Sequence, residues 1–150
     1  MTIEKMIGKD SVLLDLEVKN KKQLLEDLSK YIASIIGKEE REIFNILLER
    51  EKLGTTGIGK GVAVPHGKLP KLERIHLLFA KTKKPIEYES EDGQSVDLFF
   101  LLLAPEGSGA DHLQALSEIS KMARNRETRK TLREANNAEE IIKIFKSADL

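Results

Sequence analysis

The stretch Val96-Asp97-Leu98-Phe99-Phe100-Leu101-Leu102-Leu103 decides the fold, and Asp97 is its only polar residue. Alternate side chains of a β-strand point to opposite faces of the sheet. A strand that is apolar at consecutive positions must therefore be covered on both faces. The pattern predicts a central strand over 96–103 with a packed layer on either side of it.

The residues around this strand alternate between strand and helix patterns. Val12–Leu16 and Ile75–Lys81 are expected to be two further strands. Between them, Asn20 is expected to cap a helix, with Gln23 completing a capping box and Gly37 ending the helix. A second helix is expected from Glu39 and Glu40, at its positive end, to Leu53-Gly54.

The C-terminal part of the chain is expected to be helical. Asp111 is a candidate cap for a helix whose buried stripe is predicted at four positions: Leu113, Leu116, Ile119 and Ala123. Two short helices follow, one over Glu127–Ala135 and one capped by Asn137 with Glu140 at its third position. We therefore predict an α/β fold: a single layered domain over residues 1–150, with a mixed β-sheet flanked by helices on both faces.

Composition excludes several classes of function. The 150 residues include 25 basic and 25 acidic side chains, three histidines and no cysteine. The absence of cysteine excludes disulfides, thiolate zinc sites and cysteine nucleophiles. A net charge of zero gives no general footprint for nucleic-acid binding. The start of the chain lacks a secretory signal pattern, and no apolar run approaches the ~20 residues of a membrane span, so we expect a soluble, cytoplasmic protein.

The balanced net charge conceals local imbalance. Residues 60–84 carry seven bases and one acid, 85–120 carry eight acids and no base, and 121–133 carry six bases and one acid. Solvated faces that cancel one another are one interpretation. A docking surface of mixed sign for a protein partner is the other.

The glycine-rich segment Gly54-Thr55-Thr56-Gly57-Ile58-Gly59-Lys60-Gly61 begins like a phosphate-binding P-loop. That motif requires Ser or Thr after its lysine, because the hydroxyl binds Mg²⁺, and the loop must lead into a helix. Here Gly61 follows Lys60, and Val62-Ala63-Val64-Pro65 indicates extended chain. We therefore reject the interpretation of this chain as a nucleotide triphosphatase.

The glycines of this segment still have an expected role. Gly57, Gly59 and Gly61 are expected to let the backbone approach closely and to aim N–H groups at an anion.

His66 follows this segment, between Pro65 and Gly67. Proline restricts the backbone and glycine adds no bulk, so the imidazole is expected at a loop or strand end with open space on one side. The neutral nitrogen of an imidazole is nucleophilic near pH 7, which makes His66 a candidate phosphoryl acceptor.

Glu51, followed after six residues by Ile58-Gly59-Lys60-Gly61-Val62-Ala63-Val64-Pro65-His66-Gly67, resembles the phosphohistidine signature of the fructose/mannitol-type enzyme IIA. This family belongs to the bacterial phosphoenolpyruvate:sugar phosphotransferase system. The resemblance extends over nearly the whole chain. It implies a system component with a covalent phosphohistidine, rather than a stand-alone metabolic enzyme. It also implies that His66 accepts phosphate on Nε2 from HPr or a paralogous carrier protein.

The resemblance implies two helper residues, Arg50 and His112. Arg50 supplies a permanent cation with a planar fork that suits phosphate oxygens. His112 is expected in the first helical turn after Asp111, where a neutral imidazole can donate to a phosphate oxygen or orient His66. Positioning and charge stabilisation are what phosphoryl transfer needs. We expect no cofactor and no metal.

Plainer interpretations accompany these assignments. Arg50 and His112 can be ordinary helix residues, and His66 a structural loop histidine. His76, at the start of a strand, is predicted to be structural. Thr55 and Thr56 can offer hydroxyls to a phosphate or can cap the turn. A metal site formed by His66, His76 and His112 has unsuitable spacing.

Two functional branches remain open. Two stretches, Gly54-Thr55-Thr56-Gly57-Ile58-Gly59 and Pro65-His66-Gly67-Lys68, look most like the nitrogen-regulatory IIA branch, in which the phosphorylation state is reported to other proteins. Expected partners are then an HPr-type carrier and targets of the sensor-kinase or potassium-transporter type, with no nucleic acid and no membrane insertion. The alternative is a sugar-specific IIA that passes phosphate to a IIB partner. A domain that kept only a binding role is a third possibility, which the presence of Arg50, His66 and His112 disfavours.

Overall fold

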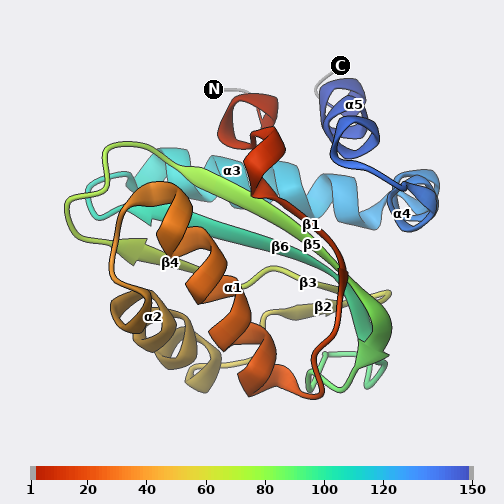
Figure 1. The fold of residues 1–150 in the computed structure, drawn as a ribbon, viewed down its shortest axis with the longest axis horizontal. Coiled ribbons are helices and arrows are strands. Elements are labelled where there is room, and N and C mark those ends of the chain that lie inside the picture. The colour runs from red at the N-terminus through yellow and green to blue at the C-terminus, as the bar shows by residue number, and fades with distance from the viewer. Residues whose placement is uncertain (1–2, 149–150) are drawn as a thin grey trace.

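A mixed six-stranded sheet forms the centre of the computed structural model, which describes residues 3–148 (Figure 1). The strand order is β1-β5-β6-β3-β2, and β4 also pairs with β6. The strands are β1 Val12–Leu16, β2 Gly57–Gly59, β3 Val62–Ala63, β4 His66–Leu69, β5 His76–Ile86 and β6 Val96–Pro105. β6 lies parallel to β3 and β4 and antiparallel to β5. The predicted central strand is confirmed.

Helices cover both faces of this sheet, as predicted (Figure 1). α1 Lys21–Ile36 and α2 Glu40–Lys52 pack on one face. On the other face are the short 3-10 helices η1 Ile3–Met6 and η2 Lys9–Ser11, with α3 Gly109–Arg124, α4 Arg126–Glu134 and α5 Ala138–Ala148. Along β6, Leu98, Phe100 and Leu102 join the α3–α5 core, whereas Phe99, Leu101 and Leu103 join the α1–α2 core. The continuous apolar run thus supplies both cores.

Local signals at the helix ends act as predicted. The Asn20 side chain accepts from the Gln23 amide at 2.9 Å, and Gln23 Oε1 accepts from the Lys19 amide at 2.8 Å. Gly37 ends α1 with φ of 68°, a conformation that favours glycine. Asn137 Oδ1 accepts from the Glu140 amide at 2.9 Å at the start of α5.

The start of α3 differs from its prediction. The helix begins at Gly109 after Ser108, so Asp111 lies within the first turn and is not the cap. The Ser108 hydroxyl instead donates to the Pro105 carbonyl at 2.6 Å. Leu113 is 69% exposed, and the buried face contains His112 in its place. Hydropathy favoured the leucine, but the two residues are neighbours about 100° apart on the helix, and only one of them can face the sheet.

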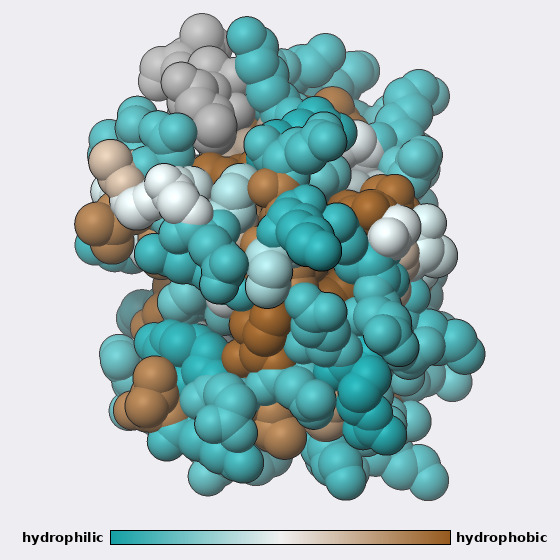
Figure 2. All heavy atoms as spheres, turned by 90° about the vertical axis from the view of Figure 1, so that its left-hand side faces the viewer, coloured by the Kyte–Doolittle hydropathy of each residue, from teal (hydrophilic) through white to brown (hydrophobic). Residues whose placement is uncertain are grey.

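Surface composition agrees with the high charge content of the chain. Figure 2 shows the left-hand side of Figure 1 as mostly hydrophilic, with separate smaller hydrophobic areas. Among the residues that the structure describes, three large apolar side chains are exposed: Leu53, Ile58 and Leu113. Among residues 3–148, no helix has the length and apolar content that crossing a bilayer requires.

Candidate functional site

His66 is the first residue of β4, directly opposite Leu102 of β6. Residues opposite one another in a ladder share a face, and Leu102 belongs to the α3–α5 core, so the His66 side chain faces α3. Gly67, next in the strand, faces α2. A Cβ at Gly67 would collide with the Ile46 side chain, so the glycine is required for β4 to approach α2 this closely. This close approach brings Arg50, near the end of α2, to His66.

Both ring nitrogens of His66 have defined partners. Nδ1 lies 2.8 Å from the Val64 carbonyl oxygen, and the Arg50 Nε–H donates to Nε2 at 3.3 Å. A carbonyl oxygen only accepts hydrogen bonds, so Nδ1 carries the proton and Nε2 carries the lone pair. Arg50 is itself held by the hydrogen bond from Nη1 to the Gly54 carbonyl at 2.8 Å. The contacts therefore favour the tautomer in which Nε2 is the nucleophile.

His112 reaches the same place from α3. Its ring centroid lies 5.7 Å from that of His66, with an angle of 64° between the ring planes. The residue is only 7% exposed, and its Nε2 is buried without a hydrogen-bond partner in the described part of the chain. Buried polar atoms are nearly always paired, so such an atom calls for an explanation, such as a missing ligand group.

Burial is the main cause that lowers the pKa of His66, and the Arg50 charge lowers it further. The hydrogen bond to Val64 and the carboxylate of Glu51 act in the opposite direction on this pKa. Burial also lowers the pKa of His112, helped by His66 and Lys68. Both imidazoles are thus kept neutral at pH 7, which is the form that a nucleophile requires.

His76 does not join this pair. It lies opposite Leu103 of β6, and Leu103 belongs to the α1–α2 core, so His76 and His66 are on different faces of the sheet. The three histidines therefore do not converge on one point, and a metal site built from all three is wrong. Burial and Arg74 lower the pKa of His76 as well.

Two of the three glycines that we expected to present N–H groups to an anion, Gly57 and Gly59, donate to protein groups instead. The Gly57 amide donates to Thr55 Oγ1 at 3.1 Å, and the Gly59 amide donates to Ser90 Oγ at 3.2 Å. These N–H groups are therefore already occupied. The close approach that glycine allows serves protein packing instead, since a Cβ at Gly57 would lie 2.9 Å from Cα of Ser90.

The two threonines take part in the same local structure. The Thr55 hydroxyl donates to the Tyr88 carbonyl at 3.2 Å, and the Thr56 hydroxyl donates to the Glu51 carboxylate. Glu51 is buried, which sequence reasoning missed, although this residue is part of the motif that carries the family resemblance. The run Glu49-Arg50-Glu51 near the end of an amphipathic helix suggests a solvated face, and only the fold brings Thr56 and Tyr88 to Glu51.

The arrangement suits covalent transfer of an anionic group. Nε2 of His66 is a neutral nucleophile, Arg50 is a fixed cation beside it, and His112 is a second neutral imidazole with an unpaired ring nitrogen. Cations and hydrogen-bond donors that are already in place stabilise charge on a transferred group.

Known proteins are similar to this chain in sequence and in fold. A nitrogen regulatory protein of Bradyrhizobium diazoefficiens is 51% identical over 145 residues, covering 97% of this chain and 95% of that protein. A fructose-specific EIIABC component of Bacillus subtilis is 33% identical over 150 residues, covering 99% of this chain but 24% of that protein. The crystal structure of the nitrogen regulatory protein IIA-Ntr from Neisseria meningitidis matches with a TM-score of 0.91 and 33% identity, covering 95% of this chain and 98% of that one.

A family match agrees with these relatives. Residues 5–148 match the family described as the phosphoenolpyruvate-dependent sugar phosphotransferase system, EIIA 2. The chain therefore belongs to the type-2 EIIA family of the phosphoenolpyruvate-dependent sugar phosphotransferase system.

Proposed function

We propose that this chain is a regulatory phosphocarrier, which accepts a phosphoryl group on Nε2 of His66 from the phosphohistidine of an HPr-type carrier. The proposal takes residues 1–150 as one functional unit. The observation that carries it is the Nε2 lone pair of His66, which faces the Arg50 guanidinium while Nδ1 is held by Val64. The resting tautomer is the one that presents Nε2 for attack.

The transfer step balances without an added base. The Nε2 lone pair attacks phosphorus while the N–P bond of the donor breaks, and the donor ring recovers its lone pair. The proton on Nδ1 stays in place, and the Val64 carbonyl stabilises the positive charge that the ring gains. In this step Arg50 releases Nε2 and donates to phosphoryl oxygens, and the unpaired Nε2 of His112 gains a partner there if it carries its proton.

Regulation is the favoured branch because of the 51% identity with a nitrogen regulatory protein over almost the whole of both chains. A phosphohistidine would add about −1.5 to −2 charges beside Arg50 and His112. A target that covers unmodified His66 with apolar or acidic surface would then be expelled. The exposed Leu53 follows α2 and the exposed Leu113 follows His112, so apolar contact area is available close to the site.

The decisive experiment uses phosphoenolpyruvate, enzyme I and an HPr-type carrier with this protein as acceptor. We expect one acid-labile, base-stable phosphate per chain. His66→Ala abolishes the labelling, and His76→Ala, a control histidine on the other face of the sheet, retains it. Labelling of His66→Ala to one phosphate per chain would overturn the assignment.

A sugar-specific IIA that passes its phosphate to a IIB partner is the second candidate. The 33% identity with a fructose-specific EIIABC component favours it. Rapid discharge of the phosphorylated protein to fructose-type IIB would support transport. Binding to a sensor kinase or potassium transporter that changes with phosphorylation, without discharge to IIB, would support regulation.

A further inference from the structure

Glu51 is a charged side chain buried beside the candidate site, with a relative exposure of 8%. Its Oε1 accepts from the Thr56 amide at 3.0 Å and from Lys21 Nζ at 2.9 Å. Its Oε2 accepts from the Tyr88 hydroxyl at 3.1 Å and from the Thr56 hydroxyl. Burial of a charge is costly unless it is paired and hydrogen-bonded, and Glu51 meets both conditions.

The partners of Glu51 come from distant parts of the chain. Lys21 is the first residue of α1, Thr56 belongs to the glycine-rich segment, and Tyr88 follows β5. Tyr88 also packs edge-on against Phe99 of β6, with ring centroids 5.6 Å apart, and Lys21 Nζ lies 4.6 Å from the Tyr88 ring centroid. The carboxylate therefore connects the start of α1, the end of α2, the glycine-rich segment and the sheet at a single point.

One hydrogen-bonded path leads from Glu51 to Nδ1 of His66. Thr56, whose amide and hydroxyl both bind the carboxylate, accepts from the Val64 amide through its carbonyl at 3.0 Å. The carbonyl of Val64 then accepts from Nδ1. A shift of Thr56 would thus move the group that fixes the tautomer of His66.

A second path, which starts at the main-chain carbonyl of Glu51 rather than at its carboxylate, leads to Nε2 of His66. The Glu51 carbonyl accepts from the Gly54 amide at 3.1 Å, and the Gly54 carbonyl accepts from Nη1 of Arg50. Arg50 donates to Nε2 of His66 through Nε of the same guanidinium. Both ring nitrogens of His66 are therefore connected to the turn that Glu51 closes.

We propose that Glu51, supported by Tyr88 and Lys21, is a positioning residue for phosphoryl transfer, which fixes the tautomer of His66 and the seat of Arg50 without touching the phosphoryl group. This inference rests on the proposed function of His66. It assigns the buried carboxylate a role in the reaction that packing alone does not require, because the path from the carboxylate through Thr56 and Val64 ends at Nδ1 of the acceptor. The path to Nε2 starts at the main-chain carbonyl of the same residue, so the placement of Glu51 bears on both ring nitrogens.

The first test compares Glu51→Gln with Glu49→Gln. Glu49 lies on the same helix but is exposed and pairs with Lys52, so it is a matched control for loss of one carboxylate charge. A displacement of about 1 Å costs on the order of 10²-fold in rate. We expect the maximal transfer rate of Glu51→Gln to fall by about that factor. The carrier concentration at half-maximal rate should stay unchanged, because the docking surface is intact. Glu49→Gln should behave as wild type.

The second test measures the tautomer of the His66 imidazole directly by ¹⁵N NMR. Wild type should show the tautomer protonated at Nδ1, and Glu51→Gln a mixture of both tautomers. Tyr88→Phe removes only the hydroxyl and keeps the ring on Phe99, so it provides the same reading if Glu51→Gln does not fold. Wild-type rates and tautomer in these variants would overturn the inference. So would slower transfer with an unchanged tautomer and a lower Tm, since this indicates a merely structural role.

The outcomes separate this inference from the proposed function. If the wild-type chain takes no phosphate from the carrier, the proposed function fails, and the tautomer measurement still tests whether Glu51 holds the ring. If the wild type is labelled and Glu51→Gln matches Glu49→Gln in rate and tautomer, only the positioning role fails.

Discussion

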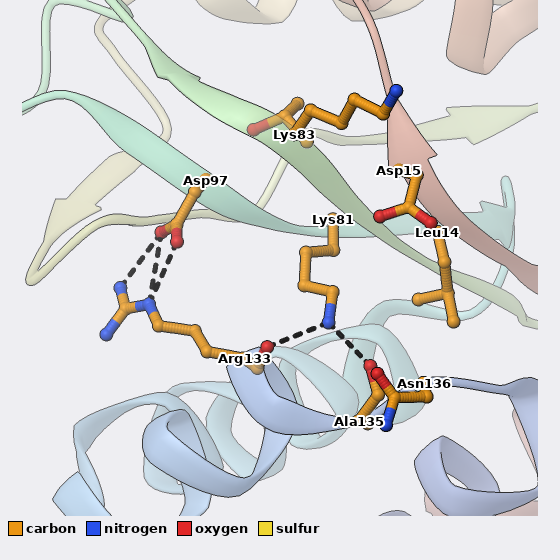
Figure 3. A pocket seen from close by; sticks show the side chains of 9 residues that line it. Leu14, Asp15, Lys81, Lys83, Asp97, Arg133, Ala135 and Asn136 are labelled. Atoms are coloured by element: carbon orange, nitrogen blue, oxygen red, sulfur yellow. Dashed lines mark hydrogen bonds and ion pairs between the residues drawn. The ribbon is translucent and has the colours of Figure 1, made fainter.

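The candidate site at His66 and the charged hollow between β5 and the end of α4 use the same kinds of side chain in opposite ways. The hollow has a volume of about 340 Å³ and is lined by charged residues of both signs, including Asp15, Lys81, Lys83, Asp97 and Arg133 (Figure 3). By charge alone it is the more conspicuous of the two. The His66 site has fewer charges but carries an unpaired ring nitrogen on His112.

The cations of the hollow are occupied by protein groups. Lys81 Nζ donates to the carbonyls of Leu132, Arg133 and Ala135 at 3.3, 2.9 and 2.7 Å, which matches the three protons of an ammonium group. Arg133 donates to both carboxylate oxygens of Asp97, as Figure 3 shows. The difference teaches that the availability of polar atoms, rather than the number of charges, distinguishes a reactive site from a structural one.

The largest expected effect is the contrast between two arginines. Arg50→Ala should slow phosphoryl transfer by about 10²–10³-fold, since it removes a charged donor to the transferred group. Arg133→Ala should leave the transfer rate unchanged and lower the free energy of unfolding, because it breaks the pair with Asp97. Transfer rates and urea unfolding of both variants check this. Equal transfer rates in the two variants would contradict the assignment of Arg50 to phosphoryl transfer and of Arg133 to stability.

A smaller effect is expected for His112→Ala. Loss of one hydrogen bond to a charged group costs about 1.5–3 kcal/mol, which corresponds to roughly a 10- to 100-fold slower transfer. The fold should be retained. Single-turnover transfer from the phosphorylated carrier measures the rate, with Gln114→Ala, an exposed neighbour on α3, as the control. A wild-type rate in His112→Ala would remove this residue from the mechanism.

Lys81→Met tests the hollow itself. The substitution removes the donor to three carbonyls near the end of α4, and loss of a typical hydrogen bond costs about 0.5–1.5 kcal/mol. We expect the midpoint of urea unfolding to fall by a corresponding amount, with transfer to His66 unaffected. Slower transfer in the folded variant would show that the hollow communicates with the site.

The smallest effect is a dependence of stability on pH. Burial lowers the pKa of His66 and His112 in the folded state, so the unfolded chain binds protons first as pH falls. The free energy of unfolding should therefore decrease as pH drops below about 6.5, the ordinary histidine pKa, until the lowered folded pKa is passed. Urea unfolding between pH 7.5 and 5 measures this slope. A double variant, His66→Ala with His112→Ala, should show a shallower slope than wild type, and an unchanged slope would contradict the burial effect.

Much of the fold can be predicted because its signals are local. The apolar run of β6 indicates two covered faces, and Asn20, Gly37 and Asn137 mark helix ends through contacts within four residues. The motif that ends at His66 is equally local. Each of these patterns depends on neighbours in the chain, so one sequence is sufficient to identify it.

The remaining features depend on partners that are distant in sequence. Glu51 is buried only because Tyr88, 37 positions away, and Lys21 come to it, and Asp97 is tolerated in β6 because Arg133 of α4 pairs with it. Which of His112 and Leu113 faces the sheet depends on where α3 begins and how it packs, and their hydropathies suggest the opposite choice. Periodicity does not carry this information.

The hydrogen bond from Arg50 to Nε2 bears on which phosphate donors can reach His66 if it is the acceptor that we propose. A lone pair that is already engaged is shielded from small reactive phosphates in solution, which have no surface with which to draw the guanidinium aside. A protein donor that docks over the site brings its own phosphoryl oxygens to Arg50 and so uncovers the nitrogen as it arrives. On the proposed function, we therefore expect small phosphate donors to phosphorylate His66 slowly and the carrier protein to phosphorylate it readily.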